Sequence, residues 1–205
     1  LIVPTAIYPF PEGAGGAWQA ISGQTRSPFS GLGWKSLGVL ELTALPSIKE
    51  ESWIPTLRET DALLVWGGHV MYLCYWMQQS GLADLLPSLG DMVWVGLSAG
   101  SMVMTPCIGK EFVGWKSPTG SDETLGFVDF SIFPHLDYPT FPENTMAYAE
   151  RWAASLPNPG YAIDDQTAIK VVDGTVDVAH KIVDGRSKDH ARAQSARFRS
   201  PARRC

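Results

Sequence analysis

The chain has 205 residues, 45% of them hydrophobic and 18% charged, and this composition supports one sizeable core but leaves little for a second domain. Gly and Pro are spread among eight Trp, eight Phe and six Tyr, which excludes a collagen-like or disordered chain. No apolar run approaches the roughly 20 residues that span a bilayer, so we expect no membrane partner. The three cysteines lack metal-site spacing, and their odd number favours a reducing cytoplasm over a disulfide-stapled secreted scaffold.

The net charge of −5 is distributed unevenly along the chain. Residues 181–205 carry eight Lys and Arg and two acids, so residues 1–180 carry a net charge of −11. A basic segment with few large apolar residues cannot bury enough surface to offset chain entropy. We therefore predict one folded domain over residues 1–180 and a disordered or non-native tail over residues 181–205. Because a short basic run supports only weak, salt-sensitive phosphate binding, we expect no nucleic-acid partner.

The first predicted elements alternate between strands and helices. Leu1–Val3 is an apolar, β-prone run, and Ser47–Glu50 has the pattern of a capping box that opens a short helix. Pro55 is expected to break this helix or to start a second turn at its own first position. The unbroken apolar run Ala62–Trp66 predicts a strand buried on both faces, as in parallel sheets, and residues 70–79 predict a helix.

The same alternation continues in the second half of the chain. Met92–Val95 predicts another buried strand, and residues 101–105 a helix that stops at Pro106. The remaining predicted elements are a short helix over 82–89, a strand over 127–133, a helix over 143–156, and a hairpin of 167–172 with 175–179, turned at Asp173-Gly174. Alternating strands and helices predict an α/β fold, a three-layer sandwich with a mostly parallel sheet.

The segment Gly96-Leu97-Ser98-Ala99-Gly100 is a G-x-S-x-G motif between a predicted strand and a predicted helix. This placement is typical of a nucleophile elbow, in which small flanking residues let a strained Ser project its hydroxyl. The helix that follows offers its N-terminal amides to a developing oxyanion. A Gly-rich turn with an N-capping Ser is the structural alternative.

A serine hydroxyl is a poor nucleophile at neutral pH, so the hypothesis requires a base, and the chain has four His. His180 and His190 lie at or in the polar tail. His135 follows the strand that ends in Ile132-Phe133, at the edge where active-site loops of open α/β sheets gather, and it is the favoured base. His69 follows Gly67-Gly68 at another strand end and is interpreted as a substrate-side or structural residue.

The base needs an acid that orients the imidazole and stabilises the imidazolium. Asp164 and Asp165 follow the predicted strand 161–163 and are the candidates, although a helix-capping or turn role is the alternative for either one. Asp137 lies too close to His135 in the sequence to be assumed to face it.

Four motifs in this order resemble one known family: Leu64–Gly68, Val95–Ser101, Phe133–His135 and Ala162–Asp165. They are similar to the aspartyl dipeptidase (peptidase E) family of serine peptidases, which also includes cyanophycinases. That family has a fold similar to class I glutamine amidotransferase domains (flavodoxin-like), in which a Cys occupies the elbow position of Ser98. The resemblance runs from about Leu1 to about Ala179.

The resemblance implies a role for each motif. It implies Ser98 as nucleophile, His135 as base and Asp165 as the preferred third member, with Glu111 as an alternative acid. For the oxyanion hole it points to the backbone N–H groups of Gly68 and Ala99. It implies no metal and no cofactor.

The sequence departs from the family pattern in three places. His69 stands where relatives usually have Asp or Asn. The chain begins where the second strand of the family fold is expected, so we expect the first strand to be absent. The tail from about His180 differs from the family's usual C-terminus.

The function implied is a serine-type peptidase that hydrolyses short peptides, dipeptides with an N-terminal Asp above all, through an acyl-enzyme on Ser98. The expected partner is a small peptide substrate, and the expected assembly is a monomer or homodimer. Two alternatives are another serine hydrolase, an esterase or amidase, with the same residues, and a catalytically silent binding protein of the amidotransferase-like fold.

Overall fold

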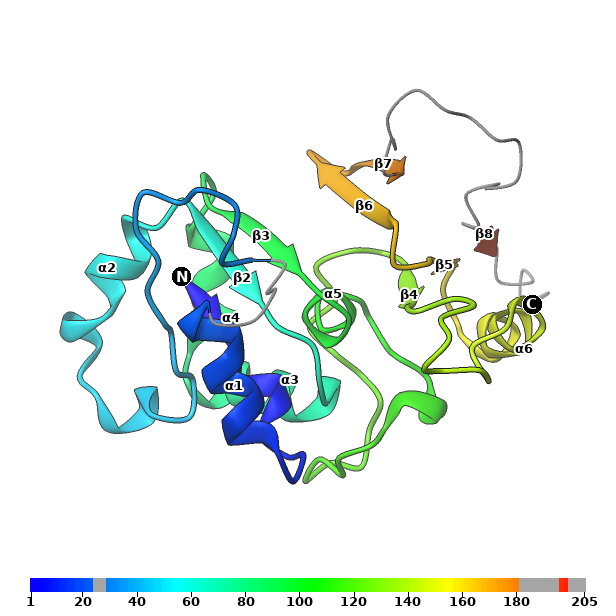
Figure 1. Ribbon diagram of the computed structural model, residues 1–205, viewed down its shortest axis with the longest axis horizontal. Helices are drawn as coiled ribbons and strands as arrows, with labels where there is room; N and C mark the ends of the chain where they lie inside the picture. Colours follow the sequence, from blue (N-terminus) through cyan, green and yellow to red (C-terminus); the bar gives the residue numbers. More distant parts are fainter. Residues whose placement is uncertain (24–28, 181–195, 199–205) are drawn as a thin grey trace.

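The structure, a computed structural model, describes residues 1–23, 29–180 and 196–198 (Figure 1). Its strands are Ile2–Val3 (β1), Ala62–Val65 (β2), Val93–Gly96 (β3), Ser131–Phe133 (β4), Gly160–Ala162 (β5), Thr167–Val172 (β6), Thr175–His180 (β7) and Ala196–Phe198 (β8). Its α-helices are Gly13–Ser22 (α1), Ile54–Arg58 (α2), Val70–Gln79 (α3), Leu82–Leu85 (α4), Ala99–Met102 (α5) and Met146–Ser155 (α6). The short 3₁₀ helices are Thr5–Ile7 (η1), Leu45–Ser47 (η2), Glu50–Ser52 (η3), Leu86–Ser88 (η4) and Lys110–Phe112 (η5).

The first sheet is parallel throughout, with the strand order β1-β2-β3. Its register places Val3 beside Val65 and Val65 beside Gly96, so the carboxyl ends of the three strands meet at one edge. The outer edge of β1 is covered, because the amide of Ile2 donates to the carbonyl of Gly38 and the amide of Leu40 donates to the carbonyl of Ile2. This covering leaves no free hydrogen-bonding row on that side of β1.

Strands β1 and β2 of this sheet are buried, as the apolar run Ala62–Trp66 predicts. The prediction of a buried strand is wrong for β3, where Val93 is 58% exposed, because β3 pairs only with β2 within the described residues. Val3 and Val65 belong to the main hydrophobic cluster, together with buried residues of α3. Their neighbours Ile2 and Leu64 point to the opposite face, where Ile21 of α1 packs against them. Successive side chains of a strand alternate between faces, so helices cover the sheet on both sides and form a three-layer arrangement.

The second sheet contains β4 and β5 in parallel, with β8 antiparallel on the other side of β5. Helix α6 packs on it through Trp152, whose ring contacts Phe133 of β4 at 5.5 Å between ring centroids. The indole nitrogen of Trp152 donates to the carbonyl of Ile108 at 2.8 Å, which satisfies its buried N–H. Thr145 caps this helix by accepting a hydrogen bond from the amide of Tyr148.

The predicted mostly parallel sheet is present in two parts, since β3 and β4 are not paired within the described residues. Helix α5 packs against both strands and lies between them in Figure 1. The hairpin of β6 and β7 forms as predicted. Its two turn residues, Asp173 and Gly174, have φ angles of 49° and 74°, the left-handed pair that a tight hairpin turn requires.

Two further local predictions are wrong. The capping box at Ser47–Glu50 is absent, because Ser47 ends η2 and its hydroxyl donates back to the carbonyl of Ala44. The strand expected over 127–133 is reduced to Ser131–Phe133, because the preceding residues bond elsewhere: the amide of Val128 donates to the carbonyl of Met104. Pro55, in contrast, lies in the first turn of a separate helix, although it is the second residue of α2 and not the first.

The prediction for the tail over residues 181–205 falls largely outside the described residues. Within it, only the backbone of Ala196–Phe198 is described, as strand β8 on β5. His190 and Cys205 lie outside the described residues.

Candidate active site

Ser98 occupies a sharp turn between β3 and α5. Its backbone has φ 50° and ψ −112°, a conformation that costs a non-glycine residue about 1–3 kcal/mol. The turn is closed by its own carbonyl, which accepts hydrogen bonds from the amides of Ser101 and Met102 and from the hydroxyl of Ser101. The side chain of Ser98 is half-buried. The G-x-S-x-G segment thus has the backbone geometry of a nucleophile elbow.

The two glycines of the motif are required by close approach. A Cβ on Gly96 would lie 2.2 Å from the carbonyl oxygen of Gly100, and a Cβ on Gly100 would lie 2.2 Å from that of Val65. Both distances are far inside van der Waals contact, so larger residues would force β3 and α5 apart. The small residues on each side of Ser98 let the helix start directly above the end of β2.

The loop after β2 lies against Ser98. A Cβ on Gly67 would be 3.2 Å from the Cβ of Ser98 and 3.7 Å from its Oγ. Gly68 has φ 142°, and a Cβ on it would lie 2.2 Å from the carbonyl oxygen of Ala6, so only glycine fits. In the described part of the chain, neither the amide of Gly68 nor that of Ala99 donates a hydrogen bond. We call Gly67, Gly68, Ser98 and Ala99 the nucleophile half of the site.

His135 and Asp165 form a second group, which we call the base half. His135 follows β4 after one residue, Asp165 follows β5 after two, and the parallel register pairs Phe133 with Ala162. The Nδ1 atom of His135 lies 2.6 Å from Oδ1 of Asp165. Because a carboxylate can only accept, Nδ1 carries the hydrogen and Nε2 of a neutral imidazole keeps its lone pair. The side chains are 21% and 40% exposed, so this pair is reachable from solvent.

The other two candidate acids are placed differently. The Oδ1 of Asp164 accepts hydrogen bonds from the amide of Gln166 and the hydroxyl of Thr167, so this carboxylate closes the turn after β5. Glu111 is exposed on η5, with its Oε2 beside Gly109. Of the three acids considered, Asp165 is the one in contact with the imidazole of His135.

His69 lies next to the nucleophile half. Its amide donates to the carbonyl of Ala6 at 2.7 Å, and its ring stacks on Phe10 with 4.4 Å between ring centroids. Burial lowers the pKa of His69 from its ordinary value of 6.5, because the charged imidazolium loses solvation. His69 is therefore a neutral, packed side chain at neutral pH, consistent with its interpretation as a substrate-side or structural residue.

The structure brings together the residues within each half but does not join the halves by a hydrogen bond. Among residues 1–23, 29–180 and 196–198, none is found between Ser98 Oγ and either nitrogen of His135. The connection between them is α5, which starts directly after Ser98 and packs against β4. Catalytic hydrogen bonds are often long in the absence of substrate and tighten when it binds.

Two aromatic residues beside His135 were missed by sequence reasoning. The ring of Phe141 lies 5.2 Å and that of Tyr138 lies 5.9 Å from the imidazole, measured between ring centroids. The available signal was their position, three and six residues after His135 in a loop that follows a strand end. No pattern in the sequence indicates that both rings fold back onto the histidine.

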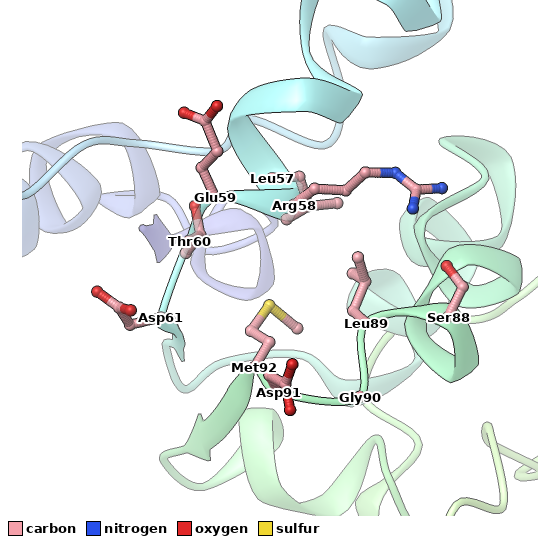
Figure 2. A pocket seen from close by; sticks show the side chains of 10 residues that line it. All are labelled: Leu57, Arg58, Glu59, Thr60, Asp61, Ser88, Leu89, Gly90, Asp91 and Met92. Carbon is pink, nitrogen blue, oxygen red and sulfur yellow. The ribbon is translucent and has the colours of Figure 1, made fainter.

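Two cavities lie away from Ser98. One of about 240 Å³ lies at the amino ends of β2 and β3, the opposite edge of the sheet. Figure 2 shows the side chain of Arg58 on the side of Ser88. The side chains of Glu59 and Asp61 point away from Arg58. The other, of about 400 Å³, is lined by Cys107, Gly109, Lys110, Glu111, Asp122, Ser155, Leu156 and Pro157. In the described ranges, no group of three or more His, Cys, Asp or Glu is placed to hold a metal ion.

Comparison with known proteins assigns this chain to a family. The model of peptidase family S51 matches residues 3–179. The chain belongs to peptidase family S51. It is therefore a hydrolytic enzyme, a serine-type peptidase, and the predicted resemblance to peptidase E is confirmed.

Solved structures support the fold of this S51 peptidase. A Listeria monocytogenes EGD-e protein, provisionally assigned as a peptidase E, is 21% identical with a TM-score of 0.58, over 88% of this chain and 85% of that one. A peptidase from an acI-B1 actinobacterium is 20% identical with a TM-score of 0.56, over 88% of this chain and 73% of that one. No curated protein matches the sequence significantly. Within its described residues, the S51 peptidase has no helix long and apolar enough to cross a membrane.

Proposed function

We propose that this S51 peptidase hydrolyses short peptides, dipeptides with an N-terminal Asp above all, through an acyl-enzyme on Ser98. The observation that carries the proposal is the conformation of Ser98, a strained elbow beside Gly67 at the carboxyl end of a parallel sheet. The preference for Asp comes from the resemblance to aspartyl dipeptidases. The first substrate to test is therefore an aspartyl dipeptide.

The acylation step uses both halves of the site. Nε2 of His135 takes the proton from Ser98 as Oγ attacks the scissile carbonyl carbon, and Asp165 stabilises the resulting imidazolium through Nδ1. The amides of Gly68 and Ala99, which have no acceptor in the described part of the chain, donate to the oxyanion of the tetrahedral intermediate. Each such donor contributes on the order of 10²–10³ in rate in serine peptidases.

Collapse of the intermediate breaks the peptide bond. The proton on Nε2 passes to the leaving amine, and the first residue of the substrate stays on Ser98 as an ester. Water then attacks this ester, with His135 as base, and the free acid leaves. This mechanism requires that substrate binding brings Ser98 Oγ and His135 Nε2 within about 3 Å.

The decisive experiment is hydrolysis of Asp-Leu by the parent beside its Ser98→Ala variant, with circular dichroism to show that both are folded. Activity in the parent and its loss in the variant support the proposal. Cleavage of simple esters or amides but not of aspartyl dipeptides would support the alternative serine hydrolase. If a folded parent cleaves none of these and a fluorophosphonate probe does not label Ser98, the binding-protein alternative stands.

The remaining proposals concern the partners, the assembly and the location of the enzyme. We expect a small peptide substrate, no nucleic-acid or membrane partner, and a monomer or homodimer. A cytoplasmic location is supported by Cys74 and Cys107, which are both free thiols. Light scattering of the purified protein tests the assembly.

A further inference from the structure

The base half carries two solvent-exposed aromatic rings that the mechanism does not use. Tyr138 is 38% and Phe141 is 39% exposed, and their ring centroids lie 6.0 Å apart. Both rings are tilted against the imidazole of His135. Large aromatic side chains cost free energy when left in water, so a pair of them held open beside a catalytic histidine needs an explanation.

The loop that carries these rings is held in place by its own hydrogen bonds. The amide of Asp137 donates to the carbonyl of Asn144 at 2.7 Å, and the amide of Phe141 donates to that of Tyr138 at 2.9 Å. The side chain of Asn144 is buried and donates to the carbonyl of Pro134, directly before His135. The two rings are therefore positioned by the same segment that positions the base.

The chemistry of the base decides which part of a substrate meets these rings. Asp165 occupies Nδ1 of His135, so Nε2 is the atom that gives a proton to the leaving amine. The residue that departs with this amine must lie on the side of His135, whereas the acyl residue lies toward Ser98. The rings of Tyr138 and Phe141 are thus next to the side chain of the leaving residue.

We infer that Tyr138 and Phe141 form a leaving-residue subsite that selects apolar and aromatic side chains. This inference rests on the proposed function. The sequence from Pro134 to Thr145 supports it, because it contains the acids Asp137 and Glu143 and no Lys or Arg, which disfavours an acidic leaving side chain. The proposed function selects the first residue of the dipeptide, and this subsite selects the second.

The test compares kcat/KM for Asp-Gly, Asp-Ala, Asp-Leu, Asp-Phe, Asp-Lys and Asp-Glu. The parent should prefer Asp-Phe to Asp-Gly about tenfold or more, the discrimination that apolar contact with a large side chain provides. Tyr138→Ala and Phe141→Ala should each remove most of this ratio, because they lower kcat/KM for Asp-Phe much more than for Asp-Gly. Phe141→Leu, which keeps an apolar surface, should retain part of the preference.

The matched control is Phe127→Ala, since Phe127 is 40% exposed and has no ring contact with His135. It should keep the substrate preference of the parent. Equal preferences in the parent and in the Phe141 variant would overturn the subsite. A parent that cleaves Asp-Lys best would overturn its apolar character.

A binding measurement separates the subsite from the proposed function. Saturation-transfer NMR detects phenylalanine amide and glycine amide, which mimic leaving groups, without any turnover. Contact with phenylalanine amide in the parent and in Phe127→Ala, and its loss in the Tyr138→Ala/Phe141→Ala double variant, supports the subsite even if no aspartyl dipeptide is cleaved. No contact in the parent, or contact unchanged in the folded double variant, overturns it while hydrolysis of Asp-Leu would still support the proposed function.

Discussion

The Nδ1 atom of His135 lies 2.6 Å from Oδ1 of Asp165, although the two residues are 30 positions apart in the chain. The contact follows from the parallel pairing of β4 and β5, which brings the loops after both strands to one edge. The amide of Leu136 donates to the carbonyl of Ile163 and extends this pairing past the strand ends. The backbone therefore fixes the orientation of the imidazole before any substrate binds.

The first prediction concerns this pair. Asp165→Asn should keep the fold and lower kcat by about 10²–10⁴, because an amide can donate to Nδ1 and so favours the tautomer whose Nε2 carries the hydrogen. Steady-state kinetics on Asp-Leu measures the effect, and Asp164→Asn serves as control because Asp164 bonds to its own turn. Full activity in Asp165→Asn together with a large loss in Glu111→Gln would transfer the role to Glu111.

The second prediction concerns the strain at Ser98. Ser98→Gly should abolish hydrolysis and raise the free energy of unfolding by about 1 kcal/mol, because glycine adopts φ 50° without a steric penalty. Ser98→Ala should be equally inactive without this gain, since its Cβ keeps the strain. The measurement is the midpoint of thermal unfolding of the parent, Ser98→Gly and Ser98→Ala. Equal midpoints for the Gly and Ala variants would mean that the elbow stores no strain.

The sequence indicates the elbow at Ser98, but not which acid lies beside His135 or how the two halves meet. Local chemistry is sufficient for the turn at Ser98, because Gly96 and Gly100 flank it within five residues and the turn is defined by its own backbone. The acid beside His135 is a tertiary property, since Asp164 and Asp165 follow the same predicted strand and the resemblance offers Glu111 as a further acid. Only the register of β4 against β5 places Asp165 on the imidazole.

The type of most elements is predicted better than their ends or their pairing, because burial shapes composition whereas ends and pairing depend on tertiary contacts. Apolar runs such as Ala62–Trp66 indicate buried strands because burial on both faces dictates their composition. The capping box at Ser47–Glu50 fails because a 3₁₀ turn with Pro46 near its start uses the Ser47 hydroxyl for the carbonyl of Ala44. The division between β3 and β4 has no sequence signal, since both strands are apolar and pairing depends on the long segment between them.

The third prediction concerns the close approach of β3 and α5. Gly96→Ala should destabilise the protein by about 1–3 kcal/mol or prevent folding, because its Cβ would lie 2.2 Å from the carbonyl oxygen of Gly100. Urea unfolding measures the change. Gly90→Ala is the matched control, since a Cβ there meets nothing within 4 Å. A Gly96 variant as stable as the Gly90 variant would contradict the tight elbow.

The fourth prediction concerns the pH dependence of stability. Burial raises the pKa of the Cys74 thiol from 9.0 to about 11, because the thiolate would lose its solvation in the hydrophobic core beneath α3. Above pH 9 the unfolded chain therefore loses a proton that the folded chain retains. The contribution of this thiol is fully present below pH 9 and is lost as the pH rises toward 11.

The expected loss is about 2 kcal/mol of unfolding free energy between pH 8 and pH 10.5. Other groups titrate in this range, so the measurement is the difference between the parent and Cys74→Ala, from urea unfolding under reducing conditions at both pH values. Removal of the side chain leaves a cavity, which makes the variant less stable at pH 8. That deficit should shrink by about 2 kcal/mol at pH 10.5, since only the parent carries the titrating thiol. A deficit that is the same at both pH values would show that Cys74 ionises equally easily in the folded and unfolded chains.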